Sequence, residues 1–283
     1  MKYLLSIVAL VCAITTVSAQ GHGASFAPVA VPALPYALNF AGERVPLENF
    51  DTKESLRREL LVTSYMHSRT MLTLLNTKRY FAIIEPILER NNIPADFKYL
   101  CMAESALDPN AVSVAKAGGL WQFMPATGKE FGLEVGTEID ERFHIEKATQ
   151  AACEYLKKSY EKFGSWTLAA AAYNLGEAGV DKRITRQQVK DYYDSFFPAE
   201  TMRYIFRILS FKLLVENPAA YGYEIRWDQY YPAYNNYKEV KVSEKDIDWS
   251  VFATNNGTTY KLLRELNPWI RDYQFANKAG NTY

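Results

Sequence analysis

The 283-residue sequence is poor in cysteine, histidine and net charge, and each shortage excludes a class of protein. It has three cysteines and three histidines, and the histidines show no paired spacing typical of metal ligands. Metal catalysis therefore has no support, and no cofactor is expected. Lysine plus arginine and aspartate plus glutamate both number 32, which argues against nucleic acid as a partner. The apolar share of 48% excludes a disordered or collagen-like chain.

Long apolar runs are confined to the start of the chain. Lys2 precedes an apolar stretch from Tyr3 to Ile14, and Val17-Ser18-Ala19 forms a small-residue cleavage site, so residues 1–19 are interpreted as a signal peptide. No later stretch is long enough to span a membrane. We expect an exported monomer in the periplasm or cell envelope, without an integral membrane segment after signal cleavage. Association with the membrane stays open.

The first two thirds of the mature sequence has a helical pattern. Residues 20–42 are rich in alanine, proline and glycine and are interpreted as a flexible leader, and residues 43–90 as a helical extension. Further helices are expected from Pro94 to Asp108-Pro109, over 144–163, over 166–175 with Ser165 and Gly176 at its ends, and from Pro198 to Asn217. No alternating strand pattern occurs between residues 43 and 220, so the predicted fold is mainly α. Cys101 and Cys153 are expected to be buried free thiols on separate helices, with a disulfide between them as the alternative that stays open.

The end of the sequence has a different pattern. Residues 223–235 are tyrosine-rich and irregular and are interpreted as a linker. Residues 238–242 alternate like a short strand, and two short helices are expected over 247–254 and 260–266. Residues 236–283 are thus predicted to form a small α+β module. The candidate catalytic residues all lie before it, so we expect cleavage of soluble substrates not to need this module.

One carboxylate lies where a general acid would be placed. In the helix from Pro94, Glu104 follows Phe97 at i+7 and falls in the same apolar stripe as Leu100 and Cys101. Burial and the negative end of the helix dipole both disfavour its charged form, so we expect a raised pKa. A carboxylic acid that stays protonated near neutral pH can act as a general acid. The alternative is a structural glutamate paired with a basic residue in the core.

Two further segments combine tight packing with polar side chains. Gly118-Gly119 permits a close approach of backbone, and bulky residues then surround Gln122. In the helix over 166–175, alanines permit close packing, while Tyr173 and Asn174 place polar groups near its end. Core packing explains each segment by itself. Together with a buried acid they indicate a carbohydrate-binding cleft.

These residues carry a resemblance to a known family. Glu104-Ser105, Gly119-Leu-Trp-Gln-Phe-Met-Pro125 and Ala172-Tyr-Asn-Leu-Gly176 resemble the three signature motifs of lysozyme-like lytic murein transglycosylases of the soluble-lytic-transglycosylase type, family 1. The likeness is greatest to the membrane-bound lytic murein transglycosylase D group. It implies a lysozyme-like helical catalytic domain over residues 91–222, with Glu104 as the single catalytic acid/base. It also implies that Ser105, Gln122, Tyr173 and Asn174 bind substrate.

Asp140 and Arg142 match a further Asp-x-Arg feature of the family, which we interpret as a structural clamp on a loop. Residues 236–283 resemble a LysM peptidoglycan-binding module, although Ser243-Glu-Lys-Asp246 replaces its usual Gly-Asp-Thr start. The implied partner is the glycan strand of peptidoglycan.

The implied reaction is non-hydrolytic cleavage of MurNAc-β-1,4-GlcNAc bonds to give 1,6-anhydroMurNAc ends. Two alternatives stay open, a hydrolase of the goose-type lysozyme kind and a catalytically silent peptidoglycan-binding protein. A hydrolase with two carboxylates would need a partner for Glu104, and Asp108 is the nearest candidate in sequence. Pro109 instead favours a turn or capping role for Asp108.

Overall fold

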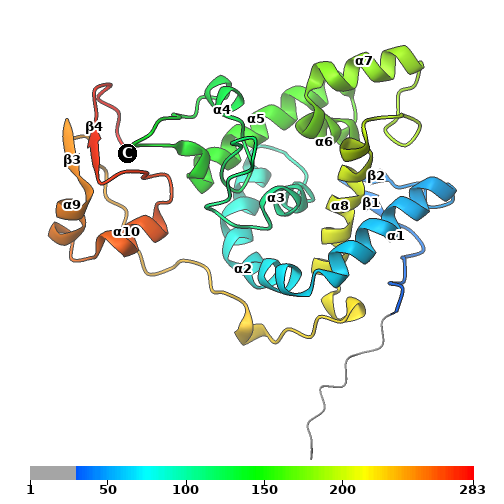
Figure 1. The fold of residues 1–283 in the computed structure, drawn as a ribbon, viewed down its shortest axis with the longest axis horizontal. Helices are drawn as coiled ribbons and strands as arrows, with labels where there is room; N and C mark the ends of the chain where they lie inside the picture. Colours follow the sequence, from blue (N-terminus) through cyan, green and yellow to red (C-terminus); the bar gives the residue numbers. More distant parts are fainter. Residues whose placement is uncertain (1–29) are drawn as a thin grey trace, which may run out of the picture. The chain divides into compact units, whose positions relative to one another are not determined.

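The computed structural model describes residues 30–283, so the expected signal peptide and the first part of the leader lie outside the described residues (Figure 1). The described chain is mainly helical, as predicted. Its helices are α1 (Phe50–Tyr65), α2 (His67–Arg90), α3 (Phe97–Ser105), α4 (Pro125–Glu130), α5 (Ile145–Phe163), α6 (Trp166–Leu175), α7 (Glu177–Gln187), α8 (Ala199–Glu216), α9 (Trp249–Asn255) and α10 (Tyr260–Leu266). None of these helices is both long and apolar enough to cross a membrane.

Helix α8 lies at the centre of the helical domain and contacts α1, α3 and α6. Eleven of its 18 residues are buried, which is the pattern of a helix enclosed by its neighbours. The four alanines of α6, Ala169–Ala172, are fully buried and allow α5 and α8 to approach closely, as the sequence predicted. This packing places the end of α3 beside the first half of α8, where Tyr204 meets Glu104.

The predicted boundaries of α6 are confirmed by its two ends. The Ser165 hydroxyl accepts a hydrogen bond from the Leu168 amide at 3.2 Å, and Gly176 ends the helix with a φ of 82°. Glu43 adds a second cap, because its carboxylate accepts bonds from the Thr167 amide and the Ser165 hydroxyl, each at 2.9 Å. The segment before α1 is thereby bonded to the start of α6.

A two-stranded hairpin occurs where the sequence pattern shows no strand. β1 (Asn39–Phe40) pairs antiparallel with β2 (Glu43–Arg44), and strands of two residues are too short to display a period. Phe40 is fully buried, with its ring 5.3 Å from that of Phe97, and the Ala41 amide donates to Asp96. The end of the segment interpreted as a flexible leader is therefore ordered.

Two helices were not predicted, and one ends earlier than expected. Helix α4 is only six residues long, and helix α7 packs on the core through Val180 and the partly buried Ile184, so each offers very few apolar positions for a sequence pattern. Helix α3 ends at Ser105 rather than at Asp108-Pro109, because Ala106 and Leu107 have φ angles of 54° and 57°. Leu107 is fully buried in this conformation, which places Glu104 in the last turn of α3.

The C-terminal module, residues 236–283, has the order β3-α9-α10-β4. β3 (Asp246–Asp248) pairs antiparallel with β4 (Gln274–Ala276), and α10 has the predicted boundaries. The strand expected over 238–242 is wrong, because only Val242 of this segment pairs, through two backbone hydrogen bonds with Tyr283. The tyrosine-rich segment before the module contacts α2, because the Tyr231 amide donates a hydrogen bond to the Leu75 carbonyl.

Candidate active site

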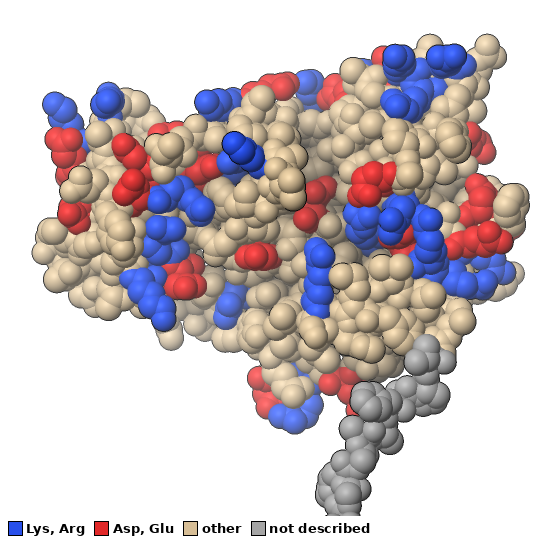
Figure 2. Space-filling model, in the orientation of Figure 1, with Lys and Arg blue, Asp and Glu red and all other residues tan. Residues whose placement is uncertain are grey.

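A groove of about 670 Å³ opens beside the C-terminal end of α3. The first half of α2 forms one wall, and the end of α3 with the loop that follows forms the other. The lining residues are Arg69, Leu72, Thr73, Asn76, Glu104, Ser105, Ala106, Leu107, Asp108, Pro109, Asn110, Ala111, Val112, Ser113 and Gln122. On the face shown in Figure 2, acidic and basic side chains are interspersed around hollowed, mainly uncharged surface.

Glu104 is the titratable group of this groove whose protonation is most altered by the fold. Burial raises its pKa to about 7, and this effect outweighs the lowering by a hydrogen bond from Tyr204 and by the positive charge of Arg207. The raised pKa expected from the apolar stripe of α3 is therefore confirmed. Among the described residues no basic group forms an ion pair with Glu104, which removes the alternative of a core glutamate held by a salt bridge.

Tyr204 contacts Glu104 directly. Its hydroxyl donates a hydrogen bond to Oε1 of Glu104, and burial followed by the Glu104 charge raises the pKa of the Tyr204 phenol. The tyrosine therefore stays a proton donor across the physiological range. This bond holds one carboxylate oxygen in place.

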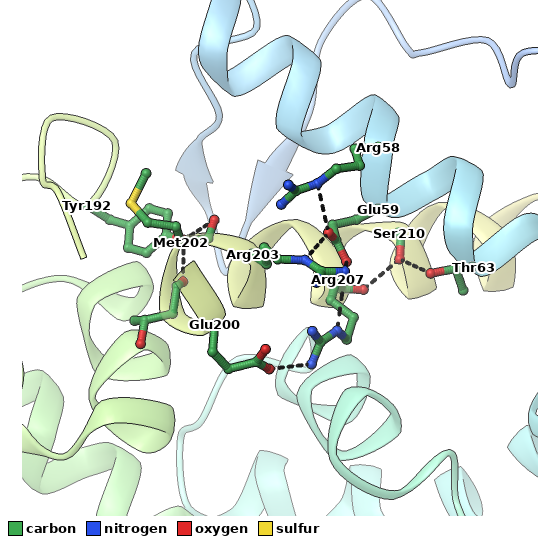
Figure 3. A network of polar contacts seen from close by, with 10 residues as sticks. Arg58, Glu59, Thr63, Tyr192, Glu200, Met202, Arg203, Arg207 and Ser210 are labelled. Carbon is green, nitrogen blue, oxygen red and sulfur yellow. Dashed lines mark hydrogen bonds and ion pairs between the residues drawn. The ribbon is translucent and has the colours of Figure 1, made fainter. Parts of the chain in front are cut away.

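The charge of Arg207 is held by a network between α1 and α8 (Figure 3). Glu59 of α1 is only 1% exposed, and its carboxylate lies 2.7 Å from Nε of Arg203 and 3.8 Å from Nε of Arg207. Nη1 of Arg207 also lies 2.8 Å from Glu200. Residues 200, 203, 204 and 207 share one face of α8. The face from which Tyr204 contacts Glu104 therefore also carries the positive charge of Arg207.

Gln122 enters the groove from a tightly folded loop. Its φ is 49°, and its side-chain amide donates to the carbonyls of Ala111 at 3.1 Å and Gly119 at 2.8 Å. Gly119 has a φ of 76°, and a Cβ at this position would lie 1.9 Å from the carbonyl oxygen of Arg142. The close approach expected of the glycine pair is thus to the backbone at Arg142.

Asp140 and Arg142 form the loop clamp that the sequence predicted. The Arg142 guanidinium donates to the carbonyls of Lys116 at 2.7 Å and Phe123 at 3.0 Å, the two ends of the tight part of the loop. Its Nε and Nη2 donate to the Asp140 carboxylate at 2.9 and 2.7 Å. Both side chains are buried, so the charge of the arginine is balanced by the aspartate and by two carbonyl dipoles.

The other three residues predicted to bind substrate are placed differently. Ser105 lines the groove, but its hydroxyl donates to the Cys101 carbonyl of its own helix at 3.2 Å. The Tyr173 hydroxyl donates to the Trp121 carbonyl at 2.8 Å, and the Asn174 amide oxygen accepts from the Thr201 hydroxyl at 2.8 Å. Tyr173 and Asn174 are not among the lining residues, and they join α6 to the Gln122 loop and to α8. Their contact with substrate stays a prediction.

Sequence reasoning missed Tyr204 and the α2 wall of the groove. Arg69, Thr73 and Asn76 follow one another at i, i+4 and i+7, a polar stripe that is visible in the sequence but that looks there like any solvated helix face. Tyr204 was missed because a buried tyrosine of α8 cannot be told from an ordinary core residue by its place in the sequence.

Two smaller expectations can also be compared with the structure. Oδ1 of Asp108 accepts a hydrogen bond from the Asn110 amide at 2.9 Å, which is the turn role that Pro109 predicted. Cys101 and Cys153 are buried free thiols on α3 and α5, as predicted. Among the described residues, no three histidine, cysteine or acidic side chains lie together so that they could hold a metal ion.

The mainly helical fold, with a groove that holds one partly buried glutamate, agrees with the lysozyme-like domain that the motifs implied. Residues 81–196 match the family model of the transglycosylase SLT domain, and residues 238–283 match the soluble lytic transglycosylase C-terminal LysM-like domain. The chain therefore carries an SLT domain followed by a LysM-like domain, as the motifs predicted.

Two curated relatives are similar in sequence to part of this chain. Membrane-bound lytic murein transglycosylase D of Escherichia coli strain K12, and the same protein of Escherichia coli O6:H1, are each 31% identical over 191 residues. The matched part is 65% of this chain and 41% of theirs, so the chain spans about two fifths of the length of these relatives. A solved structure of the lytic transglycosylase Slt of Pseudomonas aeruginosa covers 54% of this chain and 26% of its own, at 21% identity and a TM-score of 0.41.

Proposed function

We propose that the protein is a peptidoglycan lytic transglycosylase that cleaves MurNAc-β-1,4-GlcNAc bonds without water and leaves 1,6-anhydroMurNAc ends. The observation that carries this proposal is a single glutamate in the groove, Glu104, whose pKa of about 7 lets it give and take a proton at neutral pH. The SLT domain and the names of the curated relatives support murein as the substrate.

The proposed reaction uses Glu104 twice. In the first step the protonated carboxyl gives its proton to the glycosidic oxygen, the bond from that oxygen to C1 of MurNAc breaks, and GlcNAc leaves with a free 4-hydroxyl. In the second step the carboxylate takes the proton of the MurNAc 6-hydroxyl, and the 6-oxygen bonds to C1. Glu104 ends protonated, so no water or second protein carboxylate is consumed.

The neighbours of Glu104 suit these two steps. The Tyr204 hydroxyl occupies Oε1, which leaves Oε2 to exchange the proton with the substrate. Arg207, held by Glu59 and Glu200, favours the carboxylate that exists between the two steps. We propose that Gln122, Ser105, Tyr173 and Asn174 contact the sugars, the last two after giving up their present hydrogen bonds.

We further propose that the LysM-like domain binds glycan strands of peptidoglycan, and that the protein acts as an exported monomer in the cell envelope. The match of residues 238–283 to that domain supports the first statement. The apolar N-terminal stretch supports export.

Mass analysis of muropeptides released from purified sacculi tests the reaction. The proposal predicts products with 1,6-anhydro ends, each lighter by one water than the hydrolysed counterpart. Glu104→Gln should lose about 10²- to 10⁴-fold in turnover, because it removes the transferable proton while keeping the side chain's size. Glu89→Gln, an exposed change on α2, is the matched control and should keep full activity. A Glu104→Gln enzyme within tenfold of wild type would refute the assignment.

The two alternatives give different results in the same assay. A hydrolase with two carboxylates needs them about 5–5.5 Å or 6.5–9.5 Å apart, and Asp108 would be the partner nearest in sequence. Because Asp108 is exposed and caps a turn, we expect near-normal activity for Asp108→Asn. Reducing-end products with an inactive Asp108→Asn variant would favour the hydrolase. Binding to sacculi without any release would favour the silent binding protein.

A further inference from the structure

The C-terminal module does not lie apart from the helical domain. Ile270, between α10 and β4, pairs antiparallel with Ile139, and the Asp140 amide donates to the Trp269 carbonyl at 2.9 Å. On the other side of this pair the Arg271 amide donates to the Glu138 carbonyl at 2.8 Å. The segment over residues 138–140 is thus bonded to the module as a strand is bonded to its neighbour.

Side chains reinforce this backbone pairing. Phe143 and Ile139 belong to the apolar core of the module rather than to the core of the helical domain. The Arg271 guanidinium lies 4.2 Å from the centre of the Phe143 ring, and the His144 ring stacks on Trp269 with their centres 5.6 Å apart. The last residue also takes part, because the Tyr283 hydroxyl donates to Glu134 at 2.6 Å. The module therefore holds residues 134–144 from several directions.

The same short segment carries the clamp on the groove loop. Arg142 lies between Ile139 and Phe143, and its guanidinium binds the carbonyls of Lys116 and Phe123. The ring of Phe143 lies against Gly118, where an added Cβ would be 2.9 Å from it. The loop between these carbonyls contains Gln122, and it is preceded along the chain by Ala111, Val112 and Ser113. All four residues line the groove. An unbroken series of contacts thus connects the module to the wall of the groove.

We propose that the C-terminal module is a positioning element of the active site, which fixes residues 138–144 and, through Arg142, the loop that presents Gln122 to the glycan. The expected effect on catalysis rests on the proposed function. The expected effect on the order of the loop rests on the contacts alone. The contacts argue against the expectation that cleavage of soluble substrates does not need the module. Binding to the cell wall and shaping of the groove then belong to the same 46 residues matched as LysM-like, so loss of the module would impair both.

Two substitutions of the same kind separate this role from general destabilisation. Ile270→Ala removes a fully buried side chain at the pair with Ile139. Ile247→Ala removes the same atoms from the same apolar core, but in β3, whose strand partner is β4. Ile270→Val keeps a branched side chain at the interface and serves as the conservative rescue. All three are made in the full chain.

Two measurements are compared between these variants. The first is amide hydrogen exchange over residues 111–123, which requires no activity. The second is kcat and KM on soluble uncrosslinked glycan strands. A smaller folded fraction lowers the apparent kcat alone, because the folded molecules keep their KM, whereas a displaced groove loop changes KM. Ile270→Ala should speed exchange in this loop about tenfold or more and raise KM, lowering kcat/KM about tenfold. Ile247→Ala and Ile270→Val should leave loop exchange and KM at wild-type values.

Each result of these measurements either supports or overturns the proposed positioning role. Wild-type exchange over 111–123 and a wild-type KM in folded Ile270→Ala would overturn the proposal, as would equal changes in Ile247→Ala. If Ile270→Ala does not fold, Arg271→Gln removes the contact with Phe143 without opening a cavity and is judged by the same two measurements. If the wild-type protein cleaves no glycan, the proposed function fails, while the exchange data still decide whether the module positions the loop.

Discussion

Replacing Tyr204 by phenylalanine tests how the fold sets the acidity of Glu104. The change removes one hydroxyl from a side chain that is 1% exposed and leaves the ring to fill its place on α8. The hydroxyl donates to Oε1 of Glu104, and this bond favours the charged carboxylate and lowers its pKa. Burial is the larger and opposite effect, and it remains in the variant. The pKa of Glu104 in Tyr204→Phe should therefore rise above its present value of about 7.

The size of the shift follows from the energy of the lost bond. A hydrogen bond to a charged group contributes about 1.5–3 kcal/mol, and one pKa unit corresponds to about 1.4 kcal/mol. The pKa of Glu104 should rise by about one to two units, to about 8 or 9. The reaction starts from the protonated acid, so activity falls as pH rises through this pKa. The alkaline limb of the profile should move upward by the same amount, while maximal activity decreases because the carboxylate formed in the first step is less stabilised.

The measurement is the pH dependence of muropeptide release, with 1,6-anhydro products quantified between pH 5 and pH 10. Tyr192→Phe is the matched control, because its hydroxyl is also buried and donates to the carbonyl of Thr201 at 2.8 Å without contacting Glu104. Its alkaline limb should coincide with that of wild type. An unchanged or downward-shifted limb in Tyr204→Phe would show that Glu104 does not supply the proton or that this bond does not control it.

Two further predictions concern stability. The pKa of Glu104 is about 7 in the folded chain against an ordinary 4.5, so ionisation destabilises the fold increasingly from pH 4.5 to 7. Glu104→Gln should therefore be more stable than wild type in urea at pH 8, by at most about 3 kcal/mol, and the gain should vanish near pH 4; a constant difference would contradict it. Gly119→Ala should lose about 2–4 kcal/mol, because its Cβ would meet the Arg142 carbonyl, whereas Gly132→Ala, with a similar φ of 79° and open space, should lose only about 1 kcal/mol. Equal losses would refute the role of close approach.

Local patterns predicted the helices with an apolar stripe and the residues that end them. The i, i+3, i+4 spacing placed Glu104 on the buried face of α3, and Ser165 and Gly176 marked both ends of α6. Helices α4 and α7 were missed, because α4 is too short and α7 has too few apolar residues for a helical pattern to stand out. The short strand in the module was placed at 238–242 instead of 246–248, since alternation over five mostly charged residues also fits an exposed extended segment.

The sequence by itself determined that a carboxylate would lie in an apolar environment at a helix end, and that a glycine pair and an Asp-x-Arg motif would shape a loop. Only the tertiary structure decided which groups face that carboxylate. Tyr204 is 100 residues from Glu104 along the chain, and Glu59 is 144 residues from Arg203. The docking of the module on residues 138–144 is a contact of the same long-range kind. Periodicity states which face of an element is buried, but the element that covers it depends on how all the buried faces fit together, and this is a property of the folded chain alone.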